Sequence, residues 1–153
     1  MVSSFPRQVE AGKIFGTASH LIRLIIMPIW CNRDLAVIKV DLPGKQGAVR
    51  RVVVDSADFP YDSQEPPPPV GVAELIAHCR EKGLSLLLGS DANSHHTGKS
   101  NVTVRGEALL QRLAPTDLRI LNRGDYPTFV CALRKEVIDL TLCSEETEPY
   151  LRK

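Results

Sequence analysis

An aspartate and an asparagine follow directly after an apolar run in the middle of the chain. Residues 84 to 96 read LSLLLGSDANSHH, so Asp91 and Asn93 stand where the run ends. In open α/β sheets, ligands bind beyond the carboxyl ends of strands. There, the aspartate offers a charged acceptor and the asparagine an amide donor to a phosphate or a metal-bound water. The same residue types also fill ordinary strand-to-loop turns, so the pattern alone leaves both interpretations open.

A second aspartate, Asp139, lies within the sequence VIDLTL at residues 137 to 142. A carboxylate inside a buried strand is costly unless it has a partner, which favours a functional role for Asp139. The alternative is a strand-terminal aspartate whose carboxylate accepts hydrogen bonds from nearby backbone amides.

Four further residues are candidates for substrate binding: His95, His96, Arg105 and Thr128. The two histidines are adjacent and lack a spaced third ligand, so we expect loop residues that face a substrate more than metal ligands. The arginine belongs to a group of cations in this half of the chain, which forms either a local basic rim or a solvated face. The threonine is either a hydrogen-bonding residue behind the site or a β-branched strand residue.

Alternating strands and helices are expected to position these residues. The predicted strands are 35–40, 49–54, 84–88, 119–121, 128–132 and 137–142, the first two forming a hairpin around 43–47. The predicted helices are 72–79, followed by Gly83 as its cap, and 106–114, followed by Pro115. The strand at 84–88 is almost continuously apolar and is expected to be buried on both faces. The proline run at 65–69 is expected to be a stiff surface linker.

Composition limits the possible classes of protein. The 153 residues are 43% hydrophobic, which is enough for a single core and one domain. The net charge of only +1 argues against a protein that depends on non-specific attraction to phosphates. Residues 21–30 are apolar but short and interrupted by charge, so no membrane span is predicted. Four cysteines without a C-x-x-C pattern indicate reduced thiols, most of them buried, in an intracellular protein.

The order and spacing of several motifs resemble the endonuclease domain of non-LTR retrotransposon polyproteins of the jockey-like insect kind. These domains belong to the endonuclease/exonuclease/phosphatase superfamily. The resemblance covers roughly residues 31 to 144, and it rests on Arg33 to Val37, Phe59 to Ser63, Asp91-Ala92-Asn93 with His95-His96, Arg105-Gly106-Glu107, Leu121 to Gly124, Pro127-Thr128-Phe129 and Val137 to Leu140. No single motif is specific, but their order is.

The resemblance implies a fold and an activity. The fold would be α/β (α+β), a partial two-sheet sandwich over 31–144, with 1–30 poorly assigned and 145–153 as a tail. The activity would be metal-dependent DNA nicking with Mg²⁺ as cofactor, in the nucleus, next to a reverse transcriptase in the remainder of a polyprotein. Asp91 would handle the water proton, Asn93 would bind the scissile phosphate, and Asp139 would orient a catalytic histidine.

The chain also departs from the family pattern. Asp58 stands where the family has a tyrosine that touches the scissile phosphate. Residues 1–30 lack the metal-binding glutamate with its preceding asparagine strand, and no Ser-Asp-His motif follows Asp139. Three hypotheses remain: an endonuclease that needs parts from elsewhere, a non-catalytic remnant, and an interaction module that uses the proline run and the helix after it. In the first two, Asp58, Asp91 and Asp139 share one rim, and at least one of their pKa values is raised.

Overall fold

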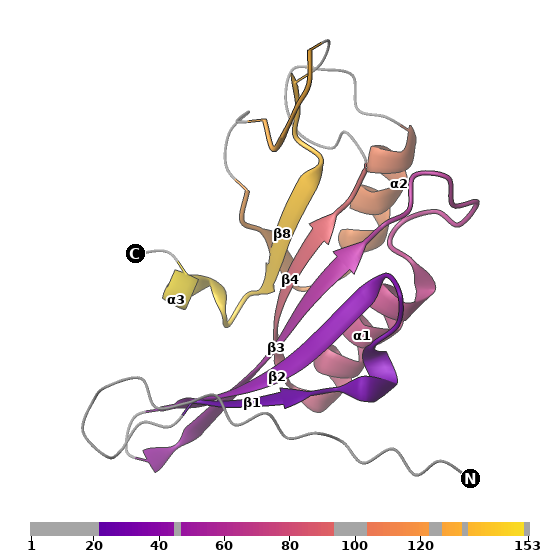
Figure 1. The fold of residues 1–153 in the computed structure, drawn as a ribbon. Coiled ribbons are helices and arrows are strands. Elements are labelled where there is room, and N and C mark those ends of the chain that lie inside the picture. The colour runs from indigo at the N-terminus through magenta and orange to yellow at the C-terminus, as the bar shows by residue number, and fades with distance from the viewer. Residues whose placement is uncertain (1–21, 45–46, 94–103, 123–126, 133–134, 152–153) are drawn as a thin grey trace, which may run out of the picture.

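The computed structural model describes residues 22–44, 47–93, 104–122, 127–132 and 135–151. They form a six-stranded sheet in the order β1-β2-β3-β4-β8-β5 and a separate two-stranded sheet, β6-β7 (Figure 1). The strands are β1 (Arg23–Ile26), β2 (Leu35–Pro43), β3 (Val49–Asp58), β4 (Ser85–Asp91), β5 (Leu118–Ile120), β6 (Phe129–Val130), β7 (Lys135–Glu136) and β8 (Asp139–Ser144). The helices are α1 (Val70–Lys82), α2 (Val104–Leu113), the short α3 (Glu148–Leu151) and a 3-10 turn, η1 (Pro28–Trp30). The mixed α/β class predicted from the sequence is confirmed.

The sheet combines a hairpin, a parallel crossover and an antiparallel addition. Strands β2 and β3 pair antiparallel, which confirms the predicted hairpin, and Gly44 N–H donates to the Ala48 carbonyl at 2.7 Å across its base. The chain then passes through α1 and returns as β4, parallel to β3. Strand β8 adds antiparallel to the other edge of β4. The predicted neighbours 84–88 and 137–142 therefore do lie side by side.

Helix α1 ends where its sequence indicates. Gly83 adopts a left-handed conformation (φ +60°), and its N–H donates to the carbonyls of Arg80 and Cys79. Glycine has no Cβ to clash in this conformation, so it is the residue best suited to end the helix. The chain then enters β4 directly.

The core lies on one face of the sheet. Figure 1 shows α1 and α2 on the same side of the strands. The side chains they cover come from alternate strand positions: Leu35, Val37, Val53, Ala57, Leu86, Leu88, Leu140 and Leu142. In β4 the intervening residues, such as Leu87, are only half-buried. The prediction that 84–88 is buried on both faces was therefore wrong, because no long helix within the described residues covers the second face.

Several other boundaries differ from the predictions. The sheet begins at Arg23, inside the segment 1–30 that was poorly assigned, and β1 is mostly exposed. The expected surface linker is partly internal, since Pro67 and Pro68 are buried beside the start of α1. Of the predicted strand 128–132, only Phe129 and Val130 are paired.

Two further expectations concern the state of the cysteines and the presence of membrane-spanning helices. None of the four cysteines forms a disulfide, and two of them, Cys31 and Cys131, are exposed, where burial was expected for most. Within the described residues, no helix has the length and apolar character needed to cross a membrane.

Candidate active site

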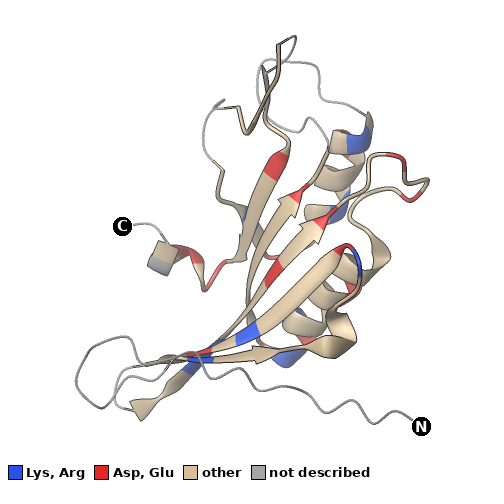
Figure 2. Cartoon of the chain, in the orientation of Figure 1, with Lys and Arg blue, Asp and Glu red and all other residues tan. Residues whose placement is uncertain are grey.

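Three aspartates lie in one row across the sheet. Asp58 is the register partner of Asp91, and Asp91 is the register partner of Asp139. In Figure 2, acidic positions, coloured red, fall at the adjoining ends of β3, β4 and β8. Since register partners on neighbouring strands place their side chains on the same face, the sheet brings three acids to one rim, as expected from the sequence.

The central aspartate, Asp91, has an altered acidity. Burial raises the pKa of its carboxyl group most, the hydrogen bond from the Asn93 backbone opposes that shift, and the charges of Asp139 and Asp58 raise the pKa further. The predicted rise is therefore present. Its main cause is desolvation, however, with carboxylate repulsion a smaller contribution.

Asn93 is held in an unusual backbone conformation next to Asp91. Its φ is +44°, in the left-handed region that asparagine tolerates better than most residues. The Asn93 N–H donates to Asp91 Oδ1 at 3.2 Å, and the Asn93 amide Nδ2 donates to the Phe59 carbonyl at 3.4 Å. An amide group carries two N–H donors, so this contact uses one of them.

Two side chains fix the start of β8, where Asp139 lies. Thr128 Oγ1 accepts hydrogen bonds from the backbone N–H groups of Ile138 and Asp139, both at 3.1 Å. The side-chain amide of Asn122 donates to the Asp139 carbonyl at 3.2 Å and accepts from the Thr141 N–H. Thr128 thus acts as a positioning residue for Asp139. Asn122 was noted in the sequence only as part of a motif, because its partners are distant along the chain.

Arg105, predicted to bind substrate, points to the backbone of the segment after β3. Its terminal nitrogen Nη2 donates to the carbonyls of Phe59 at 3.3 Å and Pro60 at 2.9 Å. Its Nε is buried and has no hydrogen-bond partner within the described part of the chain. These contacts tie α2 to the end of β3, and they direct the guanidinium away from the role of a free phosphate clamp.

The remaining candidates are only partly placed. His95 and His96 lie outside the described residues. Asp139 is half-buried at the first position of β8, so the argument that it is a charge inside a buried strand was wrong. Among the residues that the structure describes, no group of three or more His, Cys, Asp or Glu side chains is arranged to hold a metal ion. The row of carboxylates is thus not a complete cation site.

Comparison with known proteins gives structural matches only. No protein-family profile matches the chain, and no curated protein matches it by sequence. The endonuclease domain of TRAS1, a telomere-specific non-LTR retrotransposon, superposes with a TM-score of 0.62 at 26% identity, over 83% of this chain and 56% of that domain. The human Nocturnin catalytic domain matches with a TM-score of 0.48 at 10% identity, over 72% of this chain and 41% of that one. An endonuclease/exonuclease/phosphatase family protein from Leptotrichia buccalis matches with 0.46 at 12% identity, over 72% and 43%.

The TRAS1 match confirms the resemblance that the order of motifs indicated. It extends over most of the chain but over little more than half of the matched domain. Over the residues they share, this chain has the fold of a non-LTR retrotransposon endonuclease domain.

Proposed function

We propose that this chain carries the carboxylate rim of a DNA-nicking phosphodiesterase and is inactive on its own. The observation that carries the proposal is the row of Asp58, Asp91 and Asp139 in register at adjoining strand ends, with Asn93 bonded to the central member. Carboxylates that share a rim repel one another, and the charges of Asp139 and Asp58 add to the rise in the pKa of Asp91. A purely structural role gives no reason to keep them together.

The residues of the rim suit three tasks in phosphodiester hydrolysis. A base must take a proton from the attacking water, and its pKa is best raised toward the working pH. The pKa of Asp91 is shifted in that direction. The remaining N–H of the Asn93 amide is suited to hydrogen-bond a non-bridging phosphate oxygen. Asp139, positioned by Thr128 and Asn122, is suited to orient a histidine supplied by another segment.

The proposal includes Mg²⁺ only as a weakly bound ion. A divalent cation would supply neutralising charge for the phosphate. Since the described residues do not form a cluster that holds a metal ion, they do not fit a complete Mg²⁺ site. We therefore assign no catalytic step to a cation held by this chain alone.

We propose that the remaining parts of the catalytic site are supplied by another polypeptide segment. The chain spans 56% of the TRAS1 endonuclease domain, and the face of the sheet opposite α1 and α2 is where a second layer belongs. The partners of the complete site would be DNA and the remainder of a retrotransposon polyprotein, and the location would be the nucleus. A non-catalytic remnant is the alternative, favoured by Asp58 because a carboxylate repels a phosphate at that place.

Plasmid nicking and Mg²⁺ titration test the proposal together. The isolated chain is expected to give no Mg²⁺-dependent nicking of supercoiled plasmid above an EDTA control, because it lacks a complete site. NMR titration with Mg²⁺ is expected to shift the amide signals of Asp58, Asp91 and Asp139 with a dissociation constant on the order of a millimolar or weaker. Asp91→Asn should abolish these shifts. Asp62→Asn, which removes an exposed carboxylate in the turn after β3, should leave them intact.

Two outcomes contradict the proposal in different ways. Nicking by the isolated chain that disappears in Asp91→Asn would show that the site is complete. An absence of any Mg²⁺-dependent shift at the three aspartates would favour the remnant.

A further inference from the structure

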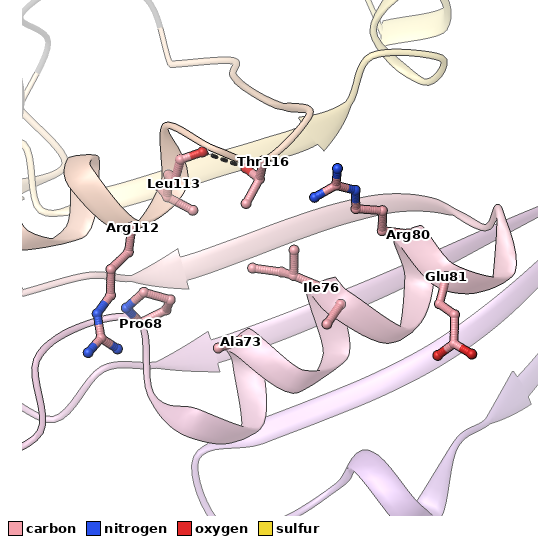
Figure 3. A pocket seen from close by; sticks show the side chains of 9 residues that line it. Pro68, Ala73, Ile76, Arg80, Glu81, Arg112, Leu113 and Thr116 are labelled. Atoms are coloured by element: carbon pink, nitrogen blue, oxygen red, sulfur yellow. Dashed lines mark hydrogen bonds between the residues drawn. The ribbon is translucent and has the colours of Figure 1, made fainter.

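We propose that a groove in the helical layer, between α1 and the end of α2, binds an acidic amphipathic peptide segment of a partner protein. The groove has a volume of about 610 Å³ and is separate from the rim of carboxylates. It is lined chiefly by Pro68, Ala73, Ile76, Leu113 and, at its ends, Arg80 and Arg112 (Figure 3). Its size is in the range of preformed ligand sites, about 300–1,000 Å³.

The floor of the groove is apolar and rigid. Ile76 of α1 and Leu113 of α2 are each only 7% exposed, and both belong to the hydrophobic core. Pro68 adds a ring of fixed backbone geometry at one end. Side chains anchored in a core do not need to be ordered again on binding, which lowers the entropy cost of association. The floor therefore suits an aliphatic side chain of a ligand.

The two ends of the groove are cationic. Figure 3 shows Arg112 beside Pro68 and Arg80 beside Thr116, with Ile76 between them. Arg112 Nη1 lies 3.5 Å from the Pro66 carbonyl, which holds its guanidinium near this end. Glu81 also lines the cavity, but in Figure 3 its carboxylate points away from both arginines. A ligand with carboxylates on both sides of an apolar side chain matches this distribution of charge.

The lining favours a peptide over a nucleic acid. Single-stranded nucleic acids bind through aromatic side chains on which their bases stack. None of the nine residues that line the groove is aromatic. An acidic peptide uses every part of the groove: its carboxylates contact the arginines, and its apolar side chain covers the floor.

Fluorescence anisotropy with a labelled twelve-residue peptide of alternating Glu and Leu tests the proposal on the full chain. Arg80→Glu and Arg112→Glu are each expected to weaken binding roughly five- to tenfold, since each replaces a solvent-screened attraction to a peptide carboxylate by a repulsion. Arg23→Glu is the control, because it makes the same change of charge at an exposed position of β1 that does not line the groove. It should change the affinity less than twofold.

A second variant tests the floor without disturbing the core. Ala77 lines the groove but is exposed, so Ala77→Trp should fill the cavity, preserve the fold and abolish binding. The proposal is overturned if the peptide does not bind, if Arg23→Glu weakens binding as much as the groove variants do, or if oligo(dT) binds the groove in place of the peptide. None of these outcomes depends on nuclease activity, so the test is independent of the proposed function.

Discussion

At the scale of single residues, Asp55 is the least expected feature of the chain. It lies in the middle of β3, only 4% exposed, and faces the helical layer between its register partners Val37 and Leu88. Neither of its carboxylate oxygens has a hydrogen-bond partner among the residues that the structure describes. Burial raises the pKa of Asp55 from 3.8 to about 7, opposed only by its own backbone amide. Burial, together with the Asp55 charge, also raises the pKa of the Cys79 thiol to about 11.

Asp55 should make the stability of the chain depend on pH. The folded state retains the proton up to about pH 7, whereas the unfolded chain releases it near 3.8. Between these values the folded state binds more protons, so the contribution of Asp55 is greatest below about pH 4 and falls as the pH rises to 7. The expected loss in the free energy of unfolding is on the order of 4 kcal/mol. Urea unfolding at several pH values from 4 to 7 gives the free energy of unfolding of the wild type and of Asp55→Asn. The quantity to compare is how steeply this free energy falls with pH in each protein.

Asp55→Asn should lose less stability than the wild type between pH 4 and 7, because an amide does not titrate. Asp62→Asn is the control, since it removes an exposed aspartate and should run parallel to the wild type. Parallel curves for wild type and Asp55→Asn would show that the Asp55 carboxyl is solvated or paired in the folded state.

At the scale of elements, β8 is held in place by hydrogen bonds from side chains as well as by pairing with neighbouring strands. Its outer neighbour, β5, pairs with only Leu142, Cys143 and Ser144. Beyond that point, the Asn122 amide bonds the backbone of β8 in the way that a further strand residue would. The Thr128 hydroxyl accepts a hydrogen bond from the backbone N–H of Asp139, the first residue of β8. The position of Asp139 thus depends on two hydrogen-bonding side chains in addition to its pairing with Asp91 of β4.

Thr128→Val should loosen this end of β8. The valine keeps the shape of threonine but leaves the N–H groups of Ile138 and Asp139 without their acceptor, at a cost of about 1 kcal/mol. Amide hydrogen exchange followed by NMR should be roughly fivefold faster at these two positions, while the amide of Leu88 is unchanged. Thr128→Ser retains the hydroxyl group and should exchange like the wild type. Equal exchange in the valine variant would mean that Thr128 does not position Asp139.

Local sequence patterns predicted the helices and strands better than they predicted burial and contacts between distant residues. Alternating β-branched residues and Gly83 are local signals, so the β2–β3 hairpin and the end of α1 were predicted correctly. The burial of Asp55, the contacts of Arg105 with carbonyls and the single-sided burial of β4 all depend on residues distant in sequence. No local pattern encodes such contacts. The row of aspartates was predicted because the resemblance supplied the pairing of β4 with β8.

At the scale of the whole molecule, one face of the large sheet is apolar and uncovered by α1 or α2. Successive register pairs form a row of Ile26, Ile38, Val54 and Leu87 across four strands. Ile26 is 49% exposed and Leu24, on the same face, 37%. Apolar side chains gathered on one face at this level of exposure are typical of a surface that another layer covers.

The isolated chain is therefore expected to bind the dye ANS and to self-associate with rising concentration. The double variant Leu24→Thr, Ile26→Thr should reduce both effects, because threonine has the β-branched shape that strands favour and lowers the apolar area. Val104→Thr is the control, since Val104 is 86% exposed on α2, away from the sheet face. Dye fluorescence and sedimentation velocity measure the two effects. A monomer that does not bind ANS would show that this face is already covered.

The order of strands around β4 also has a consequence for synthesis on the ribosome. β4 lies between β3, which precedes it in the chain, and β8, which begins only at Asp139. A nascent chain that has emerged as far as Asp91 can close β1 to β4 with α1, because all of these elements are already present. Until β8 emerges, one edge of β4 keeps its backbone N–H and C=O groups unpaired. Such an open edge is a template for pairing with other chains, so translational pauses before residue 139 should expose the protein to misassembly.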